Sequence, residues 1–158
     1  GINIQKSLFD KESIPLIKKL SSRKIILPVD VVAAKEYTKN AKTVTVDVKK
    51  IPKDHFIIDV GPKTLKLYDK ALKKSKSVVW GGTLGVFEWP SGKKGTTHVA
   101  KTLASRKRSC YVLIGGGDTA GAVDMLKLSK KMGHVATGGG ATLTWLLGKG
   151  LVAVNVLK

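Results

Sequence analysis

Two short strand-like runs that each end in a glycine-rich turn constrain this chain more than any other feature. Residues 111–114 lead into glycines 115–117, and residues 134–136 lead into glycines 138–140. A helix-like run follows each turn. A strand, a glycine turn and a helix N-terminus together form an anion site, because free backbone N–H groups and the positive end of the helix dipole face the ligand. The pattern therefore predicts an α/β fold with a phosphate site.

The rest of the chain continues this alternation of strand-like and helix-like runs. Strands that alternate with helices through short glycine turns indicate βαβ units and a parallel sheet. The near-continuous apolar run 24–32 predicts a strand buried on both faces, as in parallel sheets. Asp30, which follows Pro28, is expected to cap or hydrogen-bond a turn. No linker or repeat divides the chain, so we expect a single domain over residues 1–158. Further expected elements are strands at 43–48 and 77–80 and helices at 11–20, 65–75, 94–104, 119–131 and 141–148.

Positive charge is the second strong signal. The chain has 29 Lys and Arg against 11 Asp and Glu, a net charge of +18. Such an excess predicts a polyanionic partner such as RNA, DNA or an acidic surface. Most of the cations are lysines, which neutralise phosphate without reading bases. A solvated basic surface with no such partner remains an open alternative. The candidate RNA-phosphate contacts are Lys73, Lys74, Lys76, Lys93, Lys94, Arg106, Lys107, Arg108, Lys130 and Lys131.

The remaining composition narrows the class of protein. Cys110 is the single cysteine, so no internal disulfide and no cysteine metal cage are expected. It directly precedes the run 111–114, where a small strand-end side chain is the simpler interpretation than a nucleophile. The three histidines lack metal-like spacing. No apolar run approaches the roughly 18 residues of a membrane helix, so no membrane partner is expected.

Six short motifs follow one another in a set order: 27–32, 59–64, 78–80, 85–88, 115–119 and 137–141. In these motifs, their order and their spacing the chain resembles phosphoglycerate kinase. The resemblance covers essentially the whole chain and is to the later part of the C-terminal, nucleotide-binding domain of that family. It implies a Rossmann-like, three-layer α/β fold with a parallel sheet, as a truncated phosphoglycerate kinase C-terminal domain.

The resemblance also implies roles for individual residues. Leu27 would line the adenine slot, Gly85 and Val86 would approach the base or ribose, and Glu88 would accept ribose hydroxyls. Asp118 would bind the magnesium of Mg-ATP. The remaining nucleotide-binding residues by resemblance are Gly115, Gly116, Gly117, Thr119, Gly138, Gly139 and Gly140. Phosphoryl transfer needs positioning and charge neutralisation more than covalent chemistry, which agrees with the pattern of the two turns.

The chain departs from the family pattern near the implied site. Gly81 and Thr83 stand where the family usually has Asn and Pro. The run 143–148 lacks the acids of the family helix and carries Trp145 and Leu147 instead. The substrate-binding domain of the family, and the glycine–lysine motif that contacts the nucleotide phosphates, have no counterpart in the sequence.

These departures and the charge lead to a first hypothesis, a catalytically inactive fragment that serves as a basic structural subunit of a large RNA–protein assembly. A mitochondrial ribosome is the favoured assembly, with rRNA and other protein subunits as partners, a mitochondrial location and no required cofactor. A cytoplasmic or other organellar location stays open. The alternative is the nucleotide-binding portion of a genuine phosphoglycerate kinase, whose remainder lies on another chain or outside this sequence. A third hypothesis is a module that still binds Mg-ATP without transferring phosphate.

Overall fold

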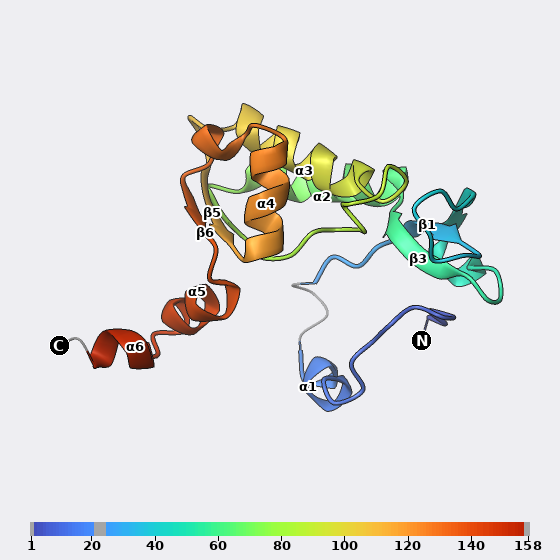
Figure 1. Cartoon of the computed structure of the whole chain (residues 1–158), viewed down its shortest axis with the longest axis horizontal. Coiled ribbons are helices and arrows are strands. Elements are labelled where there is room, and N and C mark those ends of the chain that lie inside the picture. The colour runs from blue at the N-terminus through green and yellow to red at the C-terminus, as the bar shows by residue number, and fades with distance from the viewer. Residues whose placement is uncertain (1, 21–24, 157–158) are drawn as a thin grey trace. The chain divides into compact units, whose positions relative to one another are not determined.

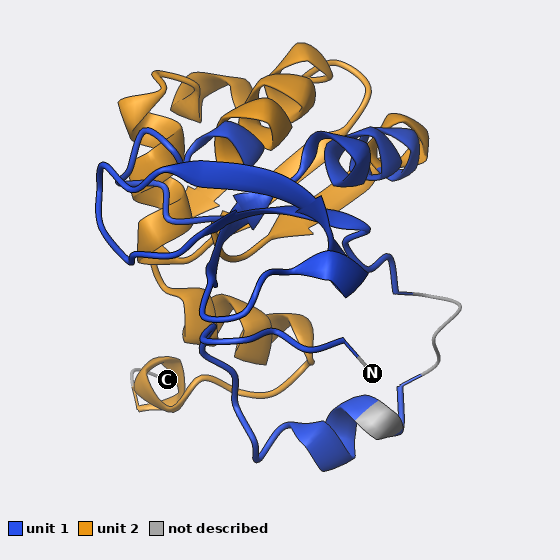
Figure 2. Cartoon of the chain, turned by 90° about the vertical axis from the view of Figure 1, so that its right-hand side faces the viewer, with its two compact units in different colours: residues 1–71, 84–95 blue, residues 72–83, 96–158 orange. Residues whose placement is uncertain are grey.

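The computed structural model describes residues 2–20 and 25–156 and divides into two compact units (Figures 1 and 2). Unit 1 comprises Gly1–Ala71 and Leu84–Gly95, and unit 2 comprises Leu72–Thr83 and Thr96–Lys158. The expectation of one domain over residues 1–158 stays a prediction. Among the described residues, no helix is both long and apolar enough to cross a membrane.

Unit 1 contains a three-stranded antiparallel sheet in the order β2-β1-β3. Val31 of the central strand faces Val46 on one side and Val60 on the other. The core beside the sheet is built from Val31, Ala33 and Ile51. The strands are β1 (Asp30–Ala34), β2 (Thr43–Asp47) and β3 (Phe56–Val60).

The expected parallel strand over residues 24–32 is therefore wrong in its start and its pairing. Its first residue, Lys24, lies outside the described residues. Residues 25–29 form no strand, and β1 begins at Asp30 with antiparallel neighbours on both sides. Pro28 has no N–H to give to a ladder, and the N–H groups of Val29 and Asp30 instead donate to the hydroxyl of Thr64 at 3.0 and 3.1 Å.

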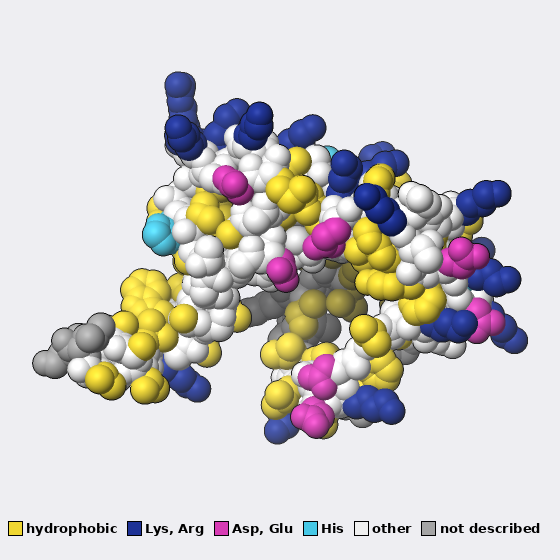
Figure 3. Space-filling model, in the orientation of Figure 1, with side chains coloured by type: hydrophobic (Ala, Val, Ile, Leu, Met, Phe, Trp, Pro, Cys, Tyr) yellow, Lys and Arg dark blue, Asp and Glu magenta, His cyan; other side chains and the backbone are white. Residues whose placement is uncertain are grey.

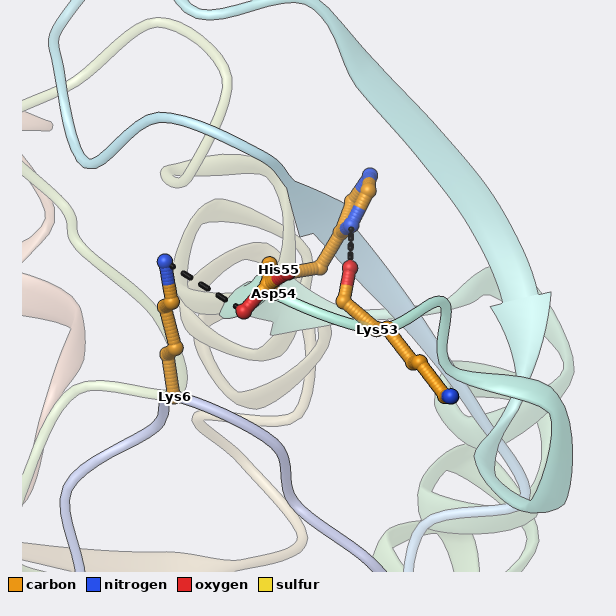
Figure 4. Close-up of polar contacts among 4 residues, drawn as sticks. All are labelled: Lys6, Lys53, Asp54 and His55. Carbon is orange, nitrogen blue, oxygen red and sulfur yellow. Dashed lines mark hydrogen bonds and ion pairs between the residues drawn. The ribbon is translucent and has the colours of Figure 1, made fainter.

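The N-terminal segment is held against the turn before β3 and against β3 itself. The ammonium of Lys6 pairs with the carboxylate of Asp54 at 3.5 Å (Figure 4). The backbone N–H of Lys6 donates to the carbonyl of His55 at 3.2 Å. One residue on, the hydroxyl of Ser7 accepts the N–H of Ile57 at 2.9 Å. These contacts join the start of the chain to the sheet of unit 1.

Unit 2 contains the parallel sheet that the glycine turns predict. Its strands lie in the order β4-β5-β6, with Trp80 beside Ile114 and Ile114 beside Val135. Leu103, Val112 and Val123 are fully buried, and the helix over residues 117–125 packs against β5. The strands are β4 (Ser77–Trp80), β5 (Tyr111–Gly115) and β6 (His134–Ala136).

Most of the helices match the expected runs, with one break. The expected helix 119–131 divides into two segments, because Lys127 adopts a left-handed conformation with φ +57 that cannot continue a right-handed helix. The helical segments are α1 (Ile14–Lys18), η2 (Val48–Lys50), α2 (Pro62–Lys74), α3 (Lys94–Ser105), α4 (Gly117–Met125), η3 (Ser129–Lys131), α5 (Gly139–Leu146) and α6 (Val152–Asn155).

Candidate phosphate-binding site

The carboxyl ends of the three parallel strands meet at one edge of the sheet in unit 2. The N–H of Gly116, after β5, donates to the carbonyl of Ala136, at the end of β6, at 2.9 Å. The N–H of Gly82, after β4, donates to the hydroxyl of Thr119 in α4 at 2.7 Å. The glycine turns that lie far apart in the sequence therefore form one continuous edge.

Glycine is required where the two main turns approach each other. Gly116 has φ +132 and ψ 142, a conformation open almost only to glycine. A β-carbon on Gly139 would lie 3.2 Å from the Cα of Gly116, and one on Gly115 would lie 3.0 Å from a methyl carbon of Thr142. By contrast, a β-carbon on Gly140 would meet nothing within 4 Å. Larger residues at the close positions would force the turns apart.

Both helices that leave this edge begin without a side-chain cap. The N-cap residues are Gly116 for α4 and Gly138 for α5, and neither offers a side-chain hydrogen bond. The first N–H groups of a helix have no partner within it, so each start presents bare donors and the positive end of a dipole. The backbone of both turns therefore suits phosphate oxygens.

Asp118 is an acidic residue at the sheet edge where the glycine turns meet. It lies exposed in the first turn of α4, next to those N–H groups. Among the described residues, no group of three or more His, Cys, Asp and Glu side chains could hold a metal ion by itself. A magnesium ion in proteins often takes one or two carboxylates and completes its shell with substrate phosphates and water. Asp118 beside a phosphate site fits that donor set.

Thr119 has a structural contact that the sequence did not reveal. Its side chain is only 1% exposed, and its hydroxyl accepts the N–H of Gly82. This hydrogen bond fastens the turn after β4 to α4, so Thr119 positions the edge. The role beside magnesium that the resemblance implies stays a prediction.

The residues implied in adenine and ribose binding lie in unit 1. Gly85 is closely surrounded, because a β-carbon there would lie 2.5 Å from the carbonyl oxygen of Gly92. The N–H of Val86 donates to the carbonyl of Ile58 at 3.0 Å. Glu88 is exposed, and Leu27 is 63% exposed. A nucleotide site shared between these residues and the glycine turns stays a prediction.

Asp30 caps the start of α2, as expected for a turn-capping residue. Its carboxylate accepts the N–H of Lys63 at 3.0 Å and the N–H and hydroxyl of Thr64 at 2.7 and 2.8 Å. Burial opposes ionisation of Asp30, but these hydrogen bonds outweigh it and lower the pKa of the carboxyl below its ordinary value. Helix α2 thus begins with a carboxylate already in place.

Asp59 holds the start of α3 in the same way, a role that the sequence did not indicate. Its carboxylate, 1% exposed, accepts the N–H groups of Gly95 and Val60, each at 2.8 Å. Burial raises the pKa of Asp59, and the hydrogen bonds from Gly95, Val60 and Lys94 act in the opposite direction. A β-carbon on Gly95 would lie 2.3 Å from the carboxylate, so only glycine lets the helix come this close.

The candidate RNA contacts differ in how free their side chains are. Arg106 is half-buried, and its guanidinium donates to the carbonyls of Leu72 and, at 3.0 Å, Ser75. The ammonium of Lys107 donates to the carbonyl of Lys130 at 2.9 Å. The exposed candidates in unit 2 are Lys73, Lys74, Lys76, Lys107, Arg108, Lys130 and Lys131, whereas Lys93 and Lys94 belong to unit 1.

Comparisons with known proteins agree with the α/β fold. The family model for phosphoglycerate kinase matches residues 1–149. The chain is 40% identical to phosphoglycerate kinase of Trichodesmium erythraeum and 42% identical to that of Corynebacterium diphtheriae, covering 99% and 100% of this chain. The structure of phosphoglycerate kinase from Coxiella burnetii matches all of this chain with a TM-score of 0.87 at 35% identity. The match covers 42% of the Coxiella chain.

The match is to part of each relative. The chain spans about 40% of the length of the curated relatives, at 41% and 40%. A second solved structure, phosphoglycerate kinase from Pyrococcus horikoshii, matches 93% of this chain with a TM-score of 0.74 at 26% identity. The expected resemblance and the α/β fold with a parallel sheet are both confirmed. This chain belongs to the phosphoglycerate kinase family.

Proposed function

We propose that this chain is the nucleotide-binding portion of a phosphoglycerate kinase. Together with the rest of such an enzyme, it takes part in phosphoryl transfer between ATP and 3-phosphoglycerate. The observation that carries the proposal is the pair of uncapped helix starts, α4 and α5, at one edge of the parallel sheet with Asp118 beside them. The identity of about 40% with phosphoglycerate kinases supports it.

Each part of the edge has a defined task in this proposal. The N–H groups at the starts of α4 and α5 bind phosphate oxygens and hold the transferring group in place. Asp118 would hold the magnesium ion, which would neutralise charge on the phosphates. Gly116 and Gly139 keep the two helix starts within reach of the same phosphate chain. The departures Gly81 and Thr83 precede both turns in the sequence.

A chimaeric enzyme tests the proposal with the whole catalytic machinery present. The matched segment of the Trichodesmium erythraeum kinase is replaced by this chain, and phosphoryl transfer from Mg-ATP to 3-phosphoglycerate is measured. We expect a folded, active enzyme in which Asp118→Asn lowers kcat by about a hundredfold or more, since metal-assisted charge stabilisation contributes several kcal/mol.

The matched control is Asp124→Asn, an exposed acid further along the same helix. It should leave kcat within about twofold of the parent, because surface substitutions away from a site have small effects. A chimaera that folds but neither binds Mg-ATP nor transfers phosphate contradicts the proposal.

The hypothesis of an inactive subunit of a mitochondrial ribosome gains no support from the comparisons. The matching proteins named above are phosphoglycerate kinases, and none points to a ribosomal role or a mitochondrial location. The cationic surface that prompted the hypothesis is a separate feature of unit 2, with consequences of its own.

A further inference from the structure

The amino ends of the strands in unit 2 carry cations that the proposed kinase chemistry does not use. Because β4, β5 and β6 are parallel, these ends meet at the edge opposite the glycine turns. A short basic segment precedes each strand. We call the set the amino-edge cluster: Lys73, Lys74 and Lys76 before β4, Arg106, Lys107 and Arg108 before β5, and Lys127, Lys130 and Lys131 before β6.

Hydrogen bonds join the three segments. The guanidinium of Arg106 donates to the carbonyls of Leu72 and Ser75, which ties the second segment to the first. The ammonium of Lys107 donates to the carbonyl of Lys130, which ties the second segment to the third. The cluster is therefore one surface with a fixed arrangement of its backbone.

The surface is strongly positive. Apart from Arg106, every member is exposed. Segments 73–76, 106–110 and 127–133 contain no acid, and the acid beside the third segment, Asp124, accepts the hydroxyl of Ser129 at 3.2 Å. Figure 3 shows Lys and Arg side chains gathered at the upper end of unit 2, above β5 and β6 as drawn in Figure 1.

An aromatic ring lies within this surface. Tyr111, the first residue of β5, is 57% exposed and lines a groove of about 440 Å³ together with Lys107 and Arg108. A β-carbon on Gly133 would lie 2.7 Å from the tyrosine ring, so the glycine lets the ring rest against the backbone. The ring is supported from beneath and open to a ligand beside the cations.

We propose that the amino-edge cluster binds single-stranded nucleic acid, with phosphates on the lysines and Arg108 and an unpaired base stacked on Tyr111. Basic grooves that contain aromatic rings bind single strands in this manner, with little sequence preference. An acidic peptide or an anionic membrane would also use the cations, but a single strand combines phosphates with flat bases that stack on a supported ring. Lysines in place of arginines also suit contacts to phosphate rather than base edges.

Fluorescence anisotropy of the full chain with labelled oligouridylate and oligothymidylate tests the proposal. We expect binding that weakens with salt, with a log–log slope of about −0.7 for each neutralised phosphate. The quadruple variant Lys73→Gln, Lys74→Gln, Lys130→Gln, Lys131→Gln should flatten this slope by about 3. The matched control, Lys93→Gln with Lys94→Gln in unit 1, should change the affinity little.

Tyr111→Ala separates nucleic acid from other polyanions. It should weaken oligouridylate and oligothymidylate roughly tenfold, the effect of losing one stacked base, and leave heparin binding unchanged. Excess Mg-ATP should not compete, because the glycine turns lie at the opposite edge. The proposal is overturned if neither oligonucleotide binds at low salt, or if the control pair weakens binding as much as the quadruple variant. It also fails if Tyr111→Ala has no effect, or if phosphatidylserine vesicles displace the strand as readily as unlabelled oligonucleotide.

Discussion

Two helices that start in unit 1, α2 and α3, begin in the opposite way to two helices of unit 2, α4 and α5. Helices α2 and α3 start in unit 1 against the buried carboxylates of Asp30 and Asp59, which accept their first N–H groups. Helices α4 and α5 start in unit 2 after Gly116 and Gly138, with no side-chain cap. The same local requirement, an acceptor for bare N–H groups, is met by the chain's own carboxylates at α2 and α3 and is left open at α4 and α5.

This difference distinguishes an anion that is part of the fold, a carboxylate of the chain, from an anion that binds as a ligand. A carboxylate supplied by the chain fixes the start of a helix permanently, whereas an uncapped start binds an anion that comes and goes. The backbone of unit 2 also requires glycine at these starts, since Gly116 has a φ of +132 that side chains rarely adopt, and a β-carbon on Gly139 would lie 3.2 Å from the Cα of Gly116. Capped starts should therefore affect stability, and uncapped starts should affect ligand binding.

The largest expected effect is on stability, from removing a cap in unit 1. Asp30→Ala leaves the N–H groups of Lys63 and of the buried Thr64 without their carboxylate acceptor and should lower the free energy of unfolding by about 3 kcal/mol, measured by urea denaturation. Asp124→Ala, an exposed acid in α4, is the control and should change stability by less than about 0.5 kcal/mol. If both variants changed the free energy of unfolding by equally small amounts, the Asp30 cap would have no measurable role in stability.

A smaller loss of stability, with a loss of binding, is expected in unit 2. Gly116→Ala places a β-carbon at φ +132 and should cost on the order of 1–3 kcal/mol of stability. It should also weaken Mg-ATP binding, because the N–H groups of α4 move. Gly140→Ala, where a β-carbon meets nothing within 4 Å, should retain the stability of the parent. If Gly116→Ala retained both stability and binding, the turn would not need its glycine.

The two caps should also differ in pH dependence. The raised pKa of Asp59 means that its contribution to stability is full below its unfolded pKa and is lost as pH rises through the folded pKa. The lowered pKa of Asp30 means the reverse, a contribution present above the unfolded pKa and lost as pH falls through the folded one.

Unfolding free energies measured between about pH 3 and pH 8 would separate these contributions. The stability of the parent relative to Asp59→Asn should fall as pH rises, and relative to Asp30→Asn it should fall as pH drops. Parallel curves for the parent and either variant would contradict the assigned shift for that residue.

The smallest expected effect is a gain in stability. Gly121 lies inside α4, is exposed, and would place a β-carbon in open space. Gly121→Ala should raise the free energy of unfolding by about 0.5–1 kcal/mol, because alanine loses less backbone freedom in a helix. Mg-ATP affinity should stay the same, unlike at Gly116. A loss of affinity at Gly121 would show that binding depends on α4 as a whole rather than on its start.

The parallel sheet and its glycine turns were predictable because they follow from local backbone requirements. Each turn combines a strand end, several glycines and a helix start within a few residues. The break at Lys127 was not predictable, because neither lysine nor the leucines beside it mark a turn. The apolar run before Asp30 was misleading, because periodicity alone does not separate a buried strand from an extended approach to one.

The parts of the site that depend on distant partners were the hardest to predict. Asp59 meets Gly95 across 36 residues of sequence, and Gly82 meets Thr119 across 37. An acid in an apolar strand, such as Asp59, is a weak signal for a helix cap. A threonine next to Asp118 suggests a ligand-binding residue, whereas the Thr119 hydroxyl hydrogen-bonds the turn after β4. Asp30 was more accessible to sequence reasoning, because it follows Pro28 at a turn.

Amide chemical shifts of the ¹⁵N-labelled chain during titration with Mg-ATP test the contrast between the two kinds of helix start most directly. We predict that the N–H signals at the starts of α4 and α5, Gly117, Asp118 and Gly140 among them, shift with nucleotide. The N–H signals of Lys63, Thr64 and Gly95, which are already bound to carboxylates, should stay in place. Shifts at these capped starts, or none at the glycine turns, would contradict the account.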